Sequence, residues 1–596
     1  MIKKWKILNS GSKGKEIVDI LLTNRKIKGK KAAGEFFHPV HPSEISLSSL
    51  NISKTEVNKA IKRIKKAHEK KESVVVYTDY DTDGVSGGTI IWETLYSLGI
   101  KAMPYVPHRV DEGYGFSEKG IDIVKEKYNP KLIISVDHGV TAWEKVAFAK
   151  KLGIDIIIID HHVLPDKLPE AVALVHTTQL AAAGLAWVFV NELIKFFESS
   201  KSSVLGSELL KMLDLAALAT IADLVPLTGA NRSMVKYGLE VLNHTKRLGL
   251  LALIAGSGLT LGEIGTYEVG HLLAPRINAS GRLTHALDSL RLLCTKDKDR
   301  AKELADKLNL TNKERQLLLE ETVLHAKDLY KGLPLPEQGE ALSKKLIFLS
   351  HETYNQGVIG LVAGKLVDEY YLPSIVISRG EVYSKASARS ISGFNIIETL
   401  RMAKDLLVDV GGHPMAAGFT VETKFLDKLE KRLQEIAGRS LTEENLVREL
   451  KIDTEISLSD ITDDLYKKIQ TFAPFGMANY EPVFVTRGVK VEDARLVGSD
   501  GKHLKLKVSQ PSIKQSTINN QQSTAIIFFD CIAFGMGELY SKLTSTKPID
   551  IAYTIDMNHW NGNYRLQLKL KDVKIIDSSY ESNSGITKKI SGFNRD

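Results

Sequence analysis

Cysteine is almost absent from this chain: among its 596 residues, only Cys294 and Cys531 carry a thiol. Two isolated cysteines exclude a disulfide framework and a cysteine-based zinc site. Long apolar runs are absent too, because no stretch approaches the roughly 18 residues of a membrane-spanning helix. The basic N-terminal segment also lacks the apolar stretch of a signal peptide. These absences predict a cytoplasmic protein.

A strong charge of either sign is lacking as well. Lysine and arginine total 80 against 72 acids, which leaves a formal charge of +8. So small a surplus is compatible with a polyanionic partner but does not demonstrate one. With 43% hydrophobic residues, the composition excludes collagen-like and wholly disordered proteins. At roughly 100–200 residues per domain, the length allows about three to five domains.

Short β-branched runs alternate with helical stretches from about residue 73 to 227. The runs SVVVY (73–77), KLIISV (131–136) and IDIIII (154–159) are apolar throughout, as in strands that are buried on both faces. This alternation predicts a parallel sheet covered by helices. The lysine-rich stretch 54–72 before it is either a nucleic-acid patch or a solvated amphipathic helix, and its apolar spacing favours the helix.

The remainder of the chain predicts two further folding units. Residues 297–330 have the spacing of one long amphipathic helix, which could join two domains, and a second strand–helix–strand pattern follows it. Beyond about residue 455, five or so short alternating strands indicate a small antiparallel barrel or sandwich. We predict that the polar stretch 509–524 is a loop and that the residues from 578 are disordered.

Acids and histidines follow each buried strand of the first unit. In chain order these are Asp79, Asp81 and Asp83, then Asp137, then Asp160, His161 and His162. The carboxyl ends of parallel strands share one edge of a sheet, so the three clusters should meet there. Asp223 lies inside an apolar run, where a carboxylate is costly unless it has a partner.

Such a cluster of carboxylates predicts a metal centre. Crowded acids raise one another's pKa values, and a bound cation removes that conflict. Carboxylate oxygens with one or two imidazoles suit manganese or magnesium, and the number of acids is enough for two ions ~3.5–4 Å apart. Each motif alone also fits a turn, a packed histidine or a buried hydrogen-bonding acid. Their joint placement at the ends of the right elements favours the metal centre.

An ordered series of motifs resembles a known family. DYDTDG, VDHG, IDHH and ATIADLVPL resemble the four N-terminal motifs of the DHH phosphoesterase superfamily. From about residue 20 to 575 the chain resembles, more closely, the RecJ family of single-strand-specific 5′→3′ DNA exonucleases. The further motifs are PHRVDEGYGFS (107–117), PRINASGR (275–282), SARSISGFN (387–395), GGHPMAAGF (411–419), PFGMANYEPVF (474–484) and NHWNGNYRLQLKLKD (558–572).

The resemblance implies an α/β architecture in which a DHH parallel-sheet lobe and a second α/β lobe (the DHH-associated domain, DHHA1) are joined by a long helix and followed by a C-terminal OB-fold β-barrel. The expected parts are an N-terminal extension (1–55), the DHH catalytic domain (56–250), a helical connector (251–335), the DHHA1 domain (336–440), the OB-fold domain (455–577) and a disordered tail (578–596).

The resemblance also implies roles for residues at the metal centre. The expected metal ligands are Asp79, Asp81, Asp83, Asp137, His161 and Asp223. Asp83, His162 and His413 are expected to be catalytic, with His162 ligating a metal or contacting the scissile phosphate and His413 donating a hydrogen bond to that phosphate. Tyr77, His138 and His176 depart from the residues that the superfamily or the RecJ family usually has at these positions.

Nucleic-acid contacts are implied on the second lobe and the barrel. The expected residues are Arg276, Asn278 and Arg282 for backbone phosphates, Arg109, Ser387 and Arg389 for the 5′-phosphate, Gly411, Gly412 and His413 for the strand, and Phe475 and Trp560 for base stacking. For the arginines, the alternative is an ordinary surface role. For the aromatic residues, the alternative is a place in the core.

The sequence therefore predicts a DNA exonuclease of recombination and repair that uses two Mn²⁺ or Mg²⁺ ions. By resemblance, its partners are single-stranded DNA with a 5′ end, a single-strand-binding protein and a helicase, and it is a monomer without membrane contact. Two alternatives stay open: a DHH-type phosphodiesterase of short oligonucleotides or cyclic dinucleotides, and an inactive RecJ-like DNA-binding scaffold. The barrel argues against the first alternative and the complete ligand set against the second.

Overall fold

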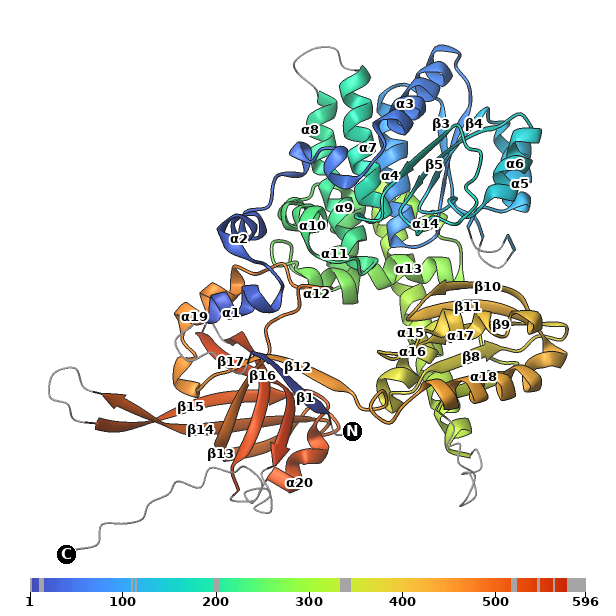
Figure 1. Cartoon of the computed structure of the whole chain (residues 1–596). Coiled ribbons are helices and arrows are strands. Elements are labelled where there is room, and N and C mark those ends of the chain that lie inside the picture. Colours follow the sequence, from blue (N-terminus) through green and yellow to red (C-terminus); the bar gives the residue numbers. More distant parts are fainter. Residues whose placement is uncertain are drawn as a thin grey trace, which may run out of the picture. The chain divides into compact units, whose positions relative to one another are not determined.

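Three β-sheets organise the chain in the computed structural model (Figure 1). The structure describes residues 3–9, 16–108, 111–112, 115–197, 204–332, 345–515, 522–543, 547–560 and 563–575. Two compact units are distinguished. The barrel unit consists of Met1–Ala33, Glu449–Ala473 and Tyr480–Asp596, and the two-sheet unit consists of Gly34–Arg448 and Pro474–Asn479.

The first sheet of the two-sheet unit is entirely parallel, with strand order β3-β2-β4-β5-β6. Its strands are β2 (Val74–Thr78), β3 (Ala102–Tyr105), β4 (Leu132–Val136), β5 (Asp155–Asp160) and β6 (Ala173–His176). Strands β2 and β4 are buried along their whole length, as their continuous apolar runs predict. Because all strands run the same way, their carboxyl ends meet at one edge.

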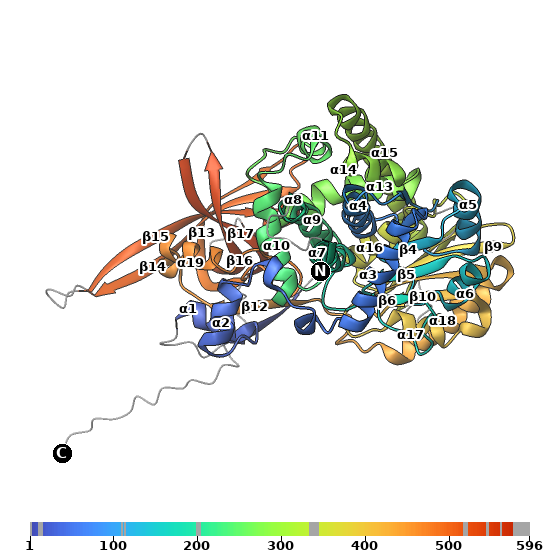
Figure 2. The same ribbon diagram turned by 90° about the horizontal axis from the view of Figure 1, so that it is seen from above.

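Helices cover both faces of this sheet, which confirms the predicted α/β lobe (Figures 1 and 2). On one face lie α3 (Lys54–Glu69), α4 (Thr82–Ser97) and α7 (Ala182–Phe197), and on the other α5 (Glu118–Tyr128) and α6 (Trp143–Lys151). Helix α3 buries Val57, Ile61 and Ile64 and exposes most of its lysines, so the stretch 54–72 does form the expected amphipathic helix.

A group of helices connects the first sheet to the second. Its members are α8 (Val204–Lys211), α9 (Leu213–Ala222), α10 (Gly229–Leu242), α11 (Leu248–Gly256), α12 (Thr266–Glu268), α13 (Ala274–Leu283), α14 (Leu287–Cys294) and α15 (Lys298–Gly332). Helix α15 is the predicted long helix, 35 residues in length. It buries Leu304 and Leu308, whereas Leu317 is 52% exposed, so the expected apolar face is only partly covered.

The second sheet has strand order β10-β11-β9-β8-β7, in which only β7 and β8 pair in parallel. Its strands are β7 (Ile347–His351), β8 (Ser374–Ser378), β9 (Tyr383–Arg389), β10 (Leu407–His413) and β11 (Ala416–Glu422). Its helices are α16 (Ile359–Tyr370), α17 (Ile396–Arg401) and α18 (Leu426–Ser440). Strands β10 and β11 form a hairpin that carries the GGH motif at the end of β10.

Five strands close the barrel of the barrel unit, in the order β13-β14-β15-β17-β16 with β16 pairing back to β13. Neighbouring strands are antiparallel, except that β15 and β17 pair in parallel. They are β13 (Phe484–Val497), β14 (His503–Gln515), β15 (Gln522–Ala533), β16 (Ile549–Trp560) and β17 (Asn563–Ile575). This closed five-stranded barrel confirms the predicted OB-fold. The unit also contains α19 (Asp463–Gln470) and α20 (Tyr540–Leu543).

Both ends of the chain contribute to the barrel unit, which the sequence did not predict. Strand β1 (Lys4–Asn9) pairs in parallel with β12 (Glu449–Glu455), and the Trp5 indole donates a 2.6 Å hydrogen bond to Asp572 Oδ2. Of the remaining N-terminal helices, α1 (Ile17–Asn24) belongs to this unit, and α2 (Gly29–Phe37) spans the boundary.

The polar stretch 509–524 is mostly strand, contrary to the predicted loop. Residues 509–515 continue β14, residues 522–524 begin β15, and the two strands pair up to Gln515 and Gln522. Polar side chains do not prevent this pairing, because the ladder is made by the backbone. Residues 516–521 and the predicted tail 578–596 lie outside the described residues. No helix in the described part is long and apolar enough to cross a membrane.

Candidate metal centre and nucleic-acid site

The turn after β2 gathers three carboxylates at the start of α4. Asp81 is the N-cap of this helix, and its Oδ1 accepts hydrogen bonds from the backbone amides of Asp83 (3.0 Å) and Gly84 (3.1 Å). Asp79 Oδ1 accepts one from the amide of Tyr80 (2.7 Å). The turn is so tight that a Cβ at Gly84 would lie 2.7 Å from the Asp79 carbonyl oxygen.

Asp83 is held from its other side by α7. Its two carboxylate oxygens accept hydrogen bonds from the amides of Ala182 and Ala183, each 2.7 Å long. These amides are in the first turn of α7, where the helix dipole stabilises negative charge. The side chain of Asp83 therefore has one fixed orientation.

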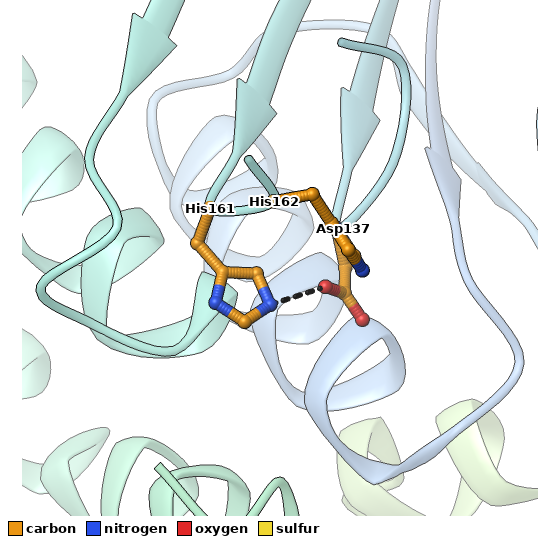
Figure 3. Close-up of side chains that lie close together, drawn as sticks. All are labelled: Asp137, His161 and His162. Atoms are coloured by element: carbon orange, nitrogen blue, oxygen red, sulfur yellow. Dashed lines mark ion pairs between the residues drawn. The ribbon is translucent and has the colours of Figure 1, made fainter. Parts of the chain in front are cut away.

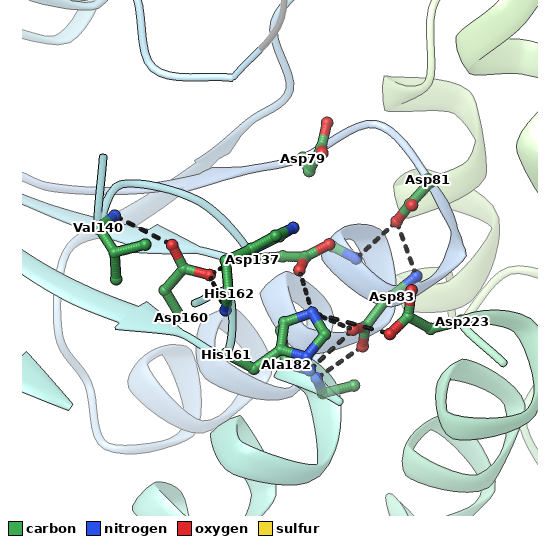
Figure 4. Close-up of polar contacts among 12 residues, drawn as sticks. Asp79, Asp81, Asp83, Asp137, Val140, Asp160, His161, His162, Ala182 and Asp223 are labelled. Atoms are coloured by element: carbon green, nitrogen blue, oxygen red, sulfur yellow. Dashed lines mark hydrogen bonds and ion pairs between the residues drawn. The ribbon is translucent and has the colours of Figure 1, made fainter. Parts of the chain in front are cut away.

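Asp137, His161 and Asp223 complete the centre from three other elements (Figures 3 and 4). Asp137 follows β4 in the left-handed region, with φ of 69°. His161 Nε2 lies 3.2 Å from Asp137 Oδ1 and 3.7 Å from both Asp83 Oδ2 and Asp223 Oδ2. Asp223 is the C-cap of α9, so the carboxylate in this apolar run lies at the end of the helix, beside the His161 ring.

The donor atoms fit divalent cations. Three groups have ligand atoms that all lie within 4.8 Å of one another: Asp79, Asp81 and Asp137; Asp83, His161 and Asp223; and Asp137, His161 and His162. Asp137 Oδ1 is buried and accepts no hydrogen bond from any described residue, a costly state that a cation would relieve. Carboxylate and imidazole ligands suit Mn²⁺ or Mg²⁺, and two groups with no shared residue suit two ions.

Three acids of the centre, Asp83, Asp137 and Asp223, have pKa values above the usual range. Burial and the charge of Asp81 raise the pKa of Asp83 to about 7. Burial and the charge of Asp83 raise the pKa of Asp223 to about 8 and that of Asp137 well above its usual range. Burial, with the neighbouring His162, lowers the pKa of His161 to about 4, which keeps this imidazole in the neutral form that ligates metals.

His162 has the opposite electrostatic setting. Its Nδ1 lies 2.7 Å from Asp160 Oδ1 (Figure 4). The other oxygen of this carboxylate, Oδ2, accepts a 3.0 Å hydrogen bond from the Val140 amide. Burial alone would lower the pKa of His162, but this contact with Asp160 raises it to about 9. The ring lies 6.2 Å from that of His413, with 14° between the planes. Two histidines, one charged, thus face each other beside the acids.

The roles of two residues that contact His162 were not predicted from the sequence. Asp160 stood in the IDHH motif, but the sequence does not reveal which neighbour its carboxylate contacts. His176, at the end of β6, has its Nε2 2.7 Å from the backbone carbonyl of His162. Its position as the last residue of a strand beside β5 was the signal that could have placed it near the site. The other two departures, Tyr77 and His138, pack together under the sheet with Phe116.

The β10–β11 hairpin presents the GGH motif on an exposed surface. Gly412 has φ of 143°, and a Cβ there would lie 2.4 Å from the carbonyl oxygen of Ala416, so the hairpin itself requires glycine. A Cβ at Gly411 would meet no described atom within 4 Å. The fold of the hairpin therefore accounts for the glycine at position 412 but not for the one at 411. The close approach of a ligand backbone would account for Gly411.

Most of the residues predicted to contact phosphates lie on two elements, β9 and α13. On β9, Arg389 Nη1 donates to Ser387 Oγ (3.1 Å), and both side chains reach Gly360 in the first turn of α16. On α13, Arg276 donates to Asn309 Oδ1 (2.7 Å), and Arg282 donates to the carbonyl of Gly357 (3.2 Å). Asn278 contacts Thr82, beside the metal centre.

The two aromatic candidates, Phe475 and Trp560, belong to different units. Phe475 belongs to the segment Pro474–Asn479, which is part of the two-sheet unit and is held there by a 2.8 Å hydrogen bond from the Leu227 amide to the Met477 carbonyl. Trp560 ends β16, but its side chain lies outside the described part, and so does Arg109.

Comparisons with known proteins agree with this architecture. Family profiles match as "DHH family, N-terminal domain" over residues 73–220, "DHHA1 domain" over 343–439 and "RecJ OB domain" over 452–572. The single-stranded-DNA-specific exonuclease RecJ of Bacillus subtilis is 37% identical, over 87% of this chain and 64% of its own length. The chain thus spans less than two thirds of that relative.

A second relative is covered more fully. The RecJ of Thermus thermophilus is 30% identical over 84% of this chain and 68% of its own length. The crystal structure of RecJ in complex with Mn²⁺ from Thermus thermophilus superposes with a TM-score of 0.75 at 25% identity, and the match covers 96% of this chain and 80% of that one. With these matches, the three sheets and the carboxylate centre, the chain belongs to the RecJ family.

Proposed function

We propose that this protein is a single-stranded-DNA-specific 5′→3′ exonuclease that hydrolyses phosphodiester bonds with two divalent cations in DNA recombination and repair. The observation that carries the proposal is the carboxylate–imidazole centre, in which two separate ligand groups meet at the contact between Asp137 and His161. Such paired groups at the ends of parallel strands are suited to phosphoryl hydrolysis.

The ligand groups divide the metal centre into two parts. Asp79, Asp81 and Asp137 would hold one cation, and Asp83, His161 and Asp223 the other. Bound Mn²⁺ or Mg²⁺ would lower the pKa of a water molecule and stabilise the negative charge that develops on the phosphate. Burial and the neighbouring carboxylates raise the pKa values of Asp83 and Asp223, and this assignment is supported because the same crowded carboxylates also attract cations.

The two facing histidines would bind the scissile phosphate. His162 keeps its proton at neutral pH because Asp160 stabilises the charged ring, so it can donate a hydrogen bond to a phosphate oxygen. Burial and the charge of His162 lower the pKa of His413, which makes it a neutral donor or acceptor. These donors would be in place before the negative charge develops.

Residues of the second lobe would set the 5′→3′ direction of hydrolysis. Ser387 and Arg389 lie beside the first turn of α16, whose amides favour an anion, and with Arg109 they would hold the 5′-phosphate. We also propose that the protein acts as a monomer in the cytoplasm, with a single-strand-binding protein and a helicase as partners. The two free thiols suit a reducing compartment.

The test is degradation of a long single strand that carries a 5′-phosphate and a 3′-fluorophore, in Mn²⁺. The parent protein should release 5′ mononucleotides and shorten the strand processively or stepwise from that end. Asp83→Ala should lose at least about 10³-fold of this activity, and Asp122→Asn, on the exposed face of α5, should retain it. Equal degradation by Asp83→Ala and the parent would overturn the catalytic assignment.

The same assay separates the alternatives. A phosphodiesterase of short oligonucleotides would leave the long strand intact and cleave dinucleotides. An inactive scaffold would bind the strand without releasing any product, while Mn²⁺ titration by calorimetry would show whether the acids still bind metal.

A further inference from the structure

Asn278, which the sequence suggests as a DNA contact, lies instead against the turn that carries the metal ligands. We propose that Asn278 is a positioning residue: its side-chain oxygen fixes Thr82 and, through it, the carboxylates of Asp81 and Asp83. This inference rests on the proposed function, because it takes these acids as metal ligands.

The hydrogen bonds of the α4 N-terminus show why this contact is needed. The first amides of a helix have no partner within the helix. Asp81 Oδ1 accepts the amides of Asp83 and Gly84, and the Val85 amide donates to the Asp81 carbonyl (2.9 Å). The Thr82 amide is the remaining one, and it donates to Asn278 Oδ1 (2.7 Å). Asn278 therefore completes the capping of α4 from another helix.

The hydroxyl of Thr82 makes the same contact. Thr82 Oγ1 donates to Asn278 Oδ1 at 2.8 Å, and Thr82 is only 1% exposed. The hydroxyl has a second, longer contact with the Ala274 carbonyl at the start of α13 (3.3 Å), whereas the buried Thr82 amide donates to Asn278 Oδ1. Because Thr82 stands between Asp81 and Asp83, loss of Asn278 Oδ1 would leave this amide without compensation, and the hydroxyl with only its longer contact, at the point where two ligands are oriented.

Helix α13 is held firmly enough to act as this support. A Cβ at Gly281 would lie 2.6 Å from the carbonyl oxygen of Tyr80, so α13 touches the backbone of the same turn. At its start, Arg276 donates to Asn309 Oδ1 (2.7 Å) and to the carbonyl of Leu272 (2.6 Å). At its end, Arg282 donates to Gly357. These contacts give the PRINASGR motif a structural use beside the metal centre.

The two interpretations of Asn278 predict opposite results. Partners that orient metal ligands typically contribute about 10–100-fold to metal affinity. As a positioning residue, Asn278 should therefore affect Mn²⁺ binding and leave metal-free DNA binding unchanged. As a direct phosphate contact, it should affect DNA binding in the absence of metal and leave Mn²⁺ binding unchanged.

The experiment measures Mn²⁺ binding to the full chain by isothermal titration calorimetry, and binding of a 5′-phosphorylated single strand in EDTA by fluorescence anisotropy. Asn278→Ala should weaken Mn²⁺ binding at least about tenfold. Asn278→Asp, which keeps the acceptor oxygen, should restore most of the affinity. The matched control is Asn243→Ala, which removes another asparagine oxygen that accepts a backbone amide, that of Ile264 (2.8 Å), at the end of α10, and should bind Mn²⁺ like the parent.

Two further variants make the result decisive. Asp137→Asn tests the metal centre itself: unchanged Mn²⁺ binding there would refute the proposed function, whereas a loss there with no effect of Asn278→Ala would refute only this inference. If Asn278→Ala does not fold, Thr82→Val removes the hydroxyl donor from the other side and should weaken Mn²⁺ binding in the same direction. Parent-like binding by Thr82→Val, or equal weakening by Asn243→Ala, would also overturn the inference.

Discussion

At the scale of single residues, the protonation states of the acids determine how the metal centre binds cations. Burial and the neighbouring carboxylates raise the pKa of Asp83 to about 7 and that of Asp223 to about 8, so both acids carry protons for a substantial part of the time near neutral pH in the absence of metal. Metal ligands must be deprotonated, so each ion that binds has to displace protons. The pH of the medium therefore controls metal affinity through these acids.

Mn²⁺ affinity should rise as the pH increases from about 6 to about 9 and then level off. The sign follows from the raised pKa values: below them the acids hold protons that compete with the ion, and above them they do not. Calorimetric titration in two buffers of different ionisation enthalpy should show proton release at about pH 7 and little release at about pH 9. A pH-independent affinity would contradict the assignment of Asp83 and Asp223 as ligands.

The pair of Asp160 and His162 gives a second prediction at this scale. Asp160→Asn should keep the shape but lower the pKa of His162, which is about 9 in the parent. Hydrolysis should fall about 10²-fold at about pH 8 and recover partly at lower pH, where the ring regains its proton. The rate is measured against pH at saturating Mn²⁺, with Asp122→Asn as the control. A loss of activity that is equal at every pH would point to misfolding instead.

The sequence predicted which acids and which imidazole lie together at the proposed metal centre, but not the residues that orient them. Asp81, Asp83, Asp137 and His161 could be found because each follows a buried strand, and parallel strands end at one edge. The roles of Asp160, His176 and Asn278 depend on which side chains meet across elements. Those contacts are set by packing, and no local pattern encodes them.

At the scale of elements, two adjacent glycines in the hairpin of β10 and β11 have different structural requirements. Gly412→Ala combines an unfavourable φ of 143° with a 2.4 Å approach to the Ala416 carbonyl oxygen, and it should destabilise the two-sheet unit by about 1–3 kcal/mol. Gly411→Ala has open space and is the matched control. Thermal unfolding of both variants measures the difference. Equal melting temperatures would show that the hairpin tolerates a side chain at either position.

Elements were predictable where the pattern is local and uniform. The apolar strands β2, β4 and β5 and the long helix α15 follow directly from their runs and spacing. The strands at 509–515 and 522–524 were missed because a polar composition resembles that of a loop. Strand β1 was missed because its partner, β12, lies more than four hundred residues away in the chain.

At the scale of the whole molecule, the metal centre belongs to one unit only. All the proposed ligands lie in the two-sheet unit, whereas the barrel unit is built from both ends of the chain. The formal charge of +8 includes the acids of this centre, and bound cations would offset their negative charge. A modest net charge is therefore no argument against a DNA substrate.

Metal should stabilise the two units unequally. A ligand that binds only the folded state stabilises it by about 2.7 kcal/mol at a hundred times its Kd. In scanning calorimetry, Mn²⁺ should raise the melting temperature of the two-sheet unit, and the transition of the barrel unit should not move. Asp83→Ala should reduce that shift, and Trp5→Ala, which removes the hydrogen bond to Asp572, should lower only the barrel transition. An equal Mn²⁺ shift of both transitions would mean that the two units unfold together.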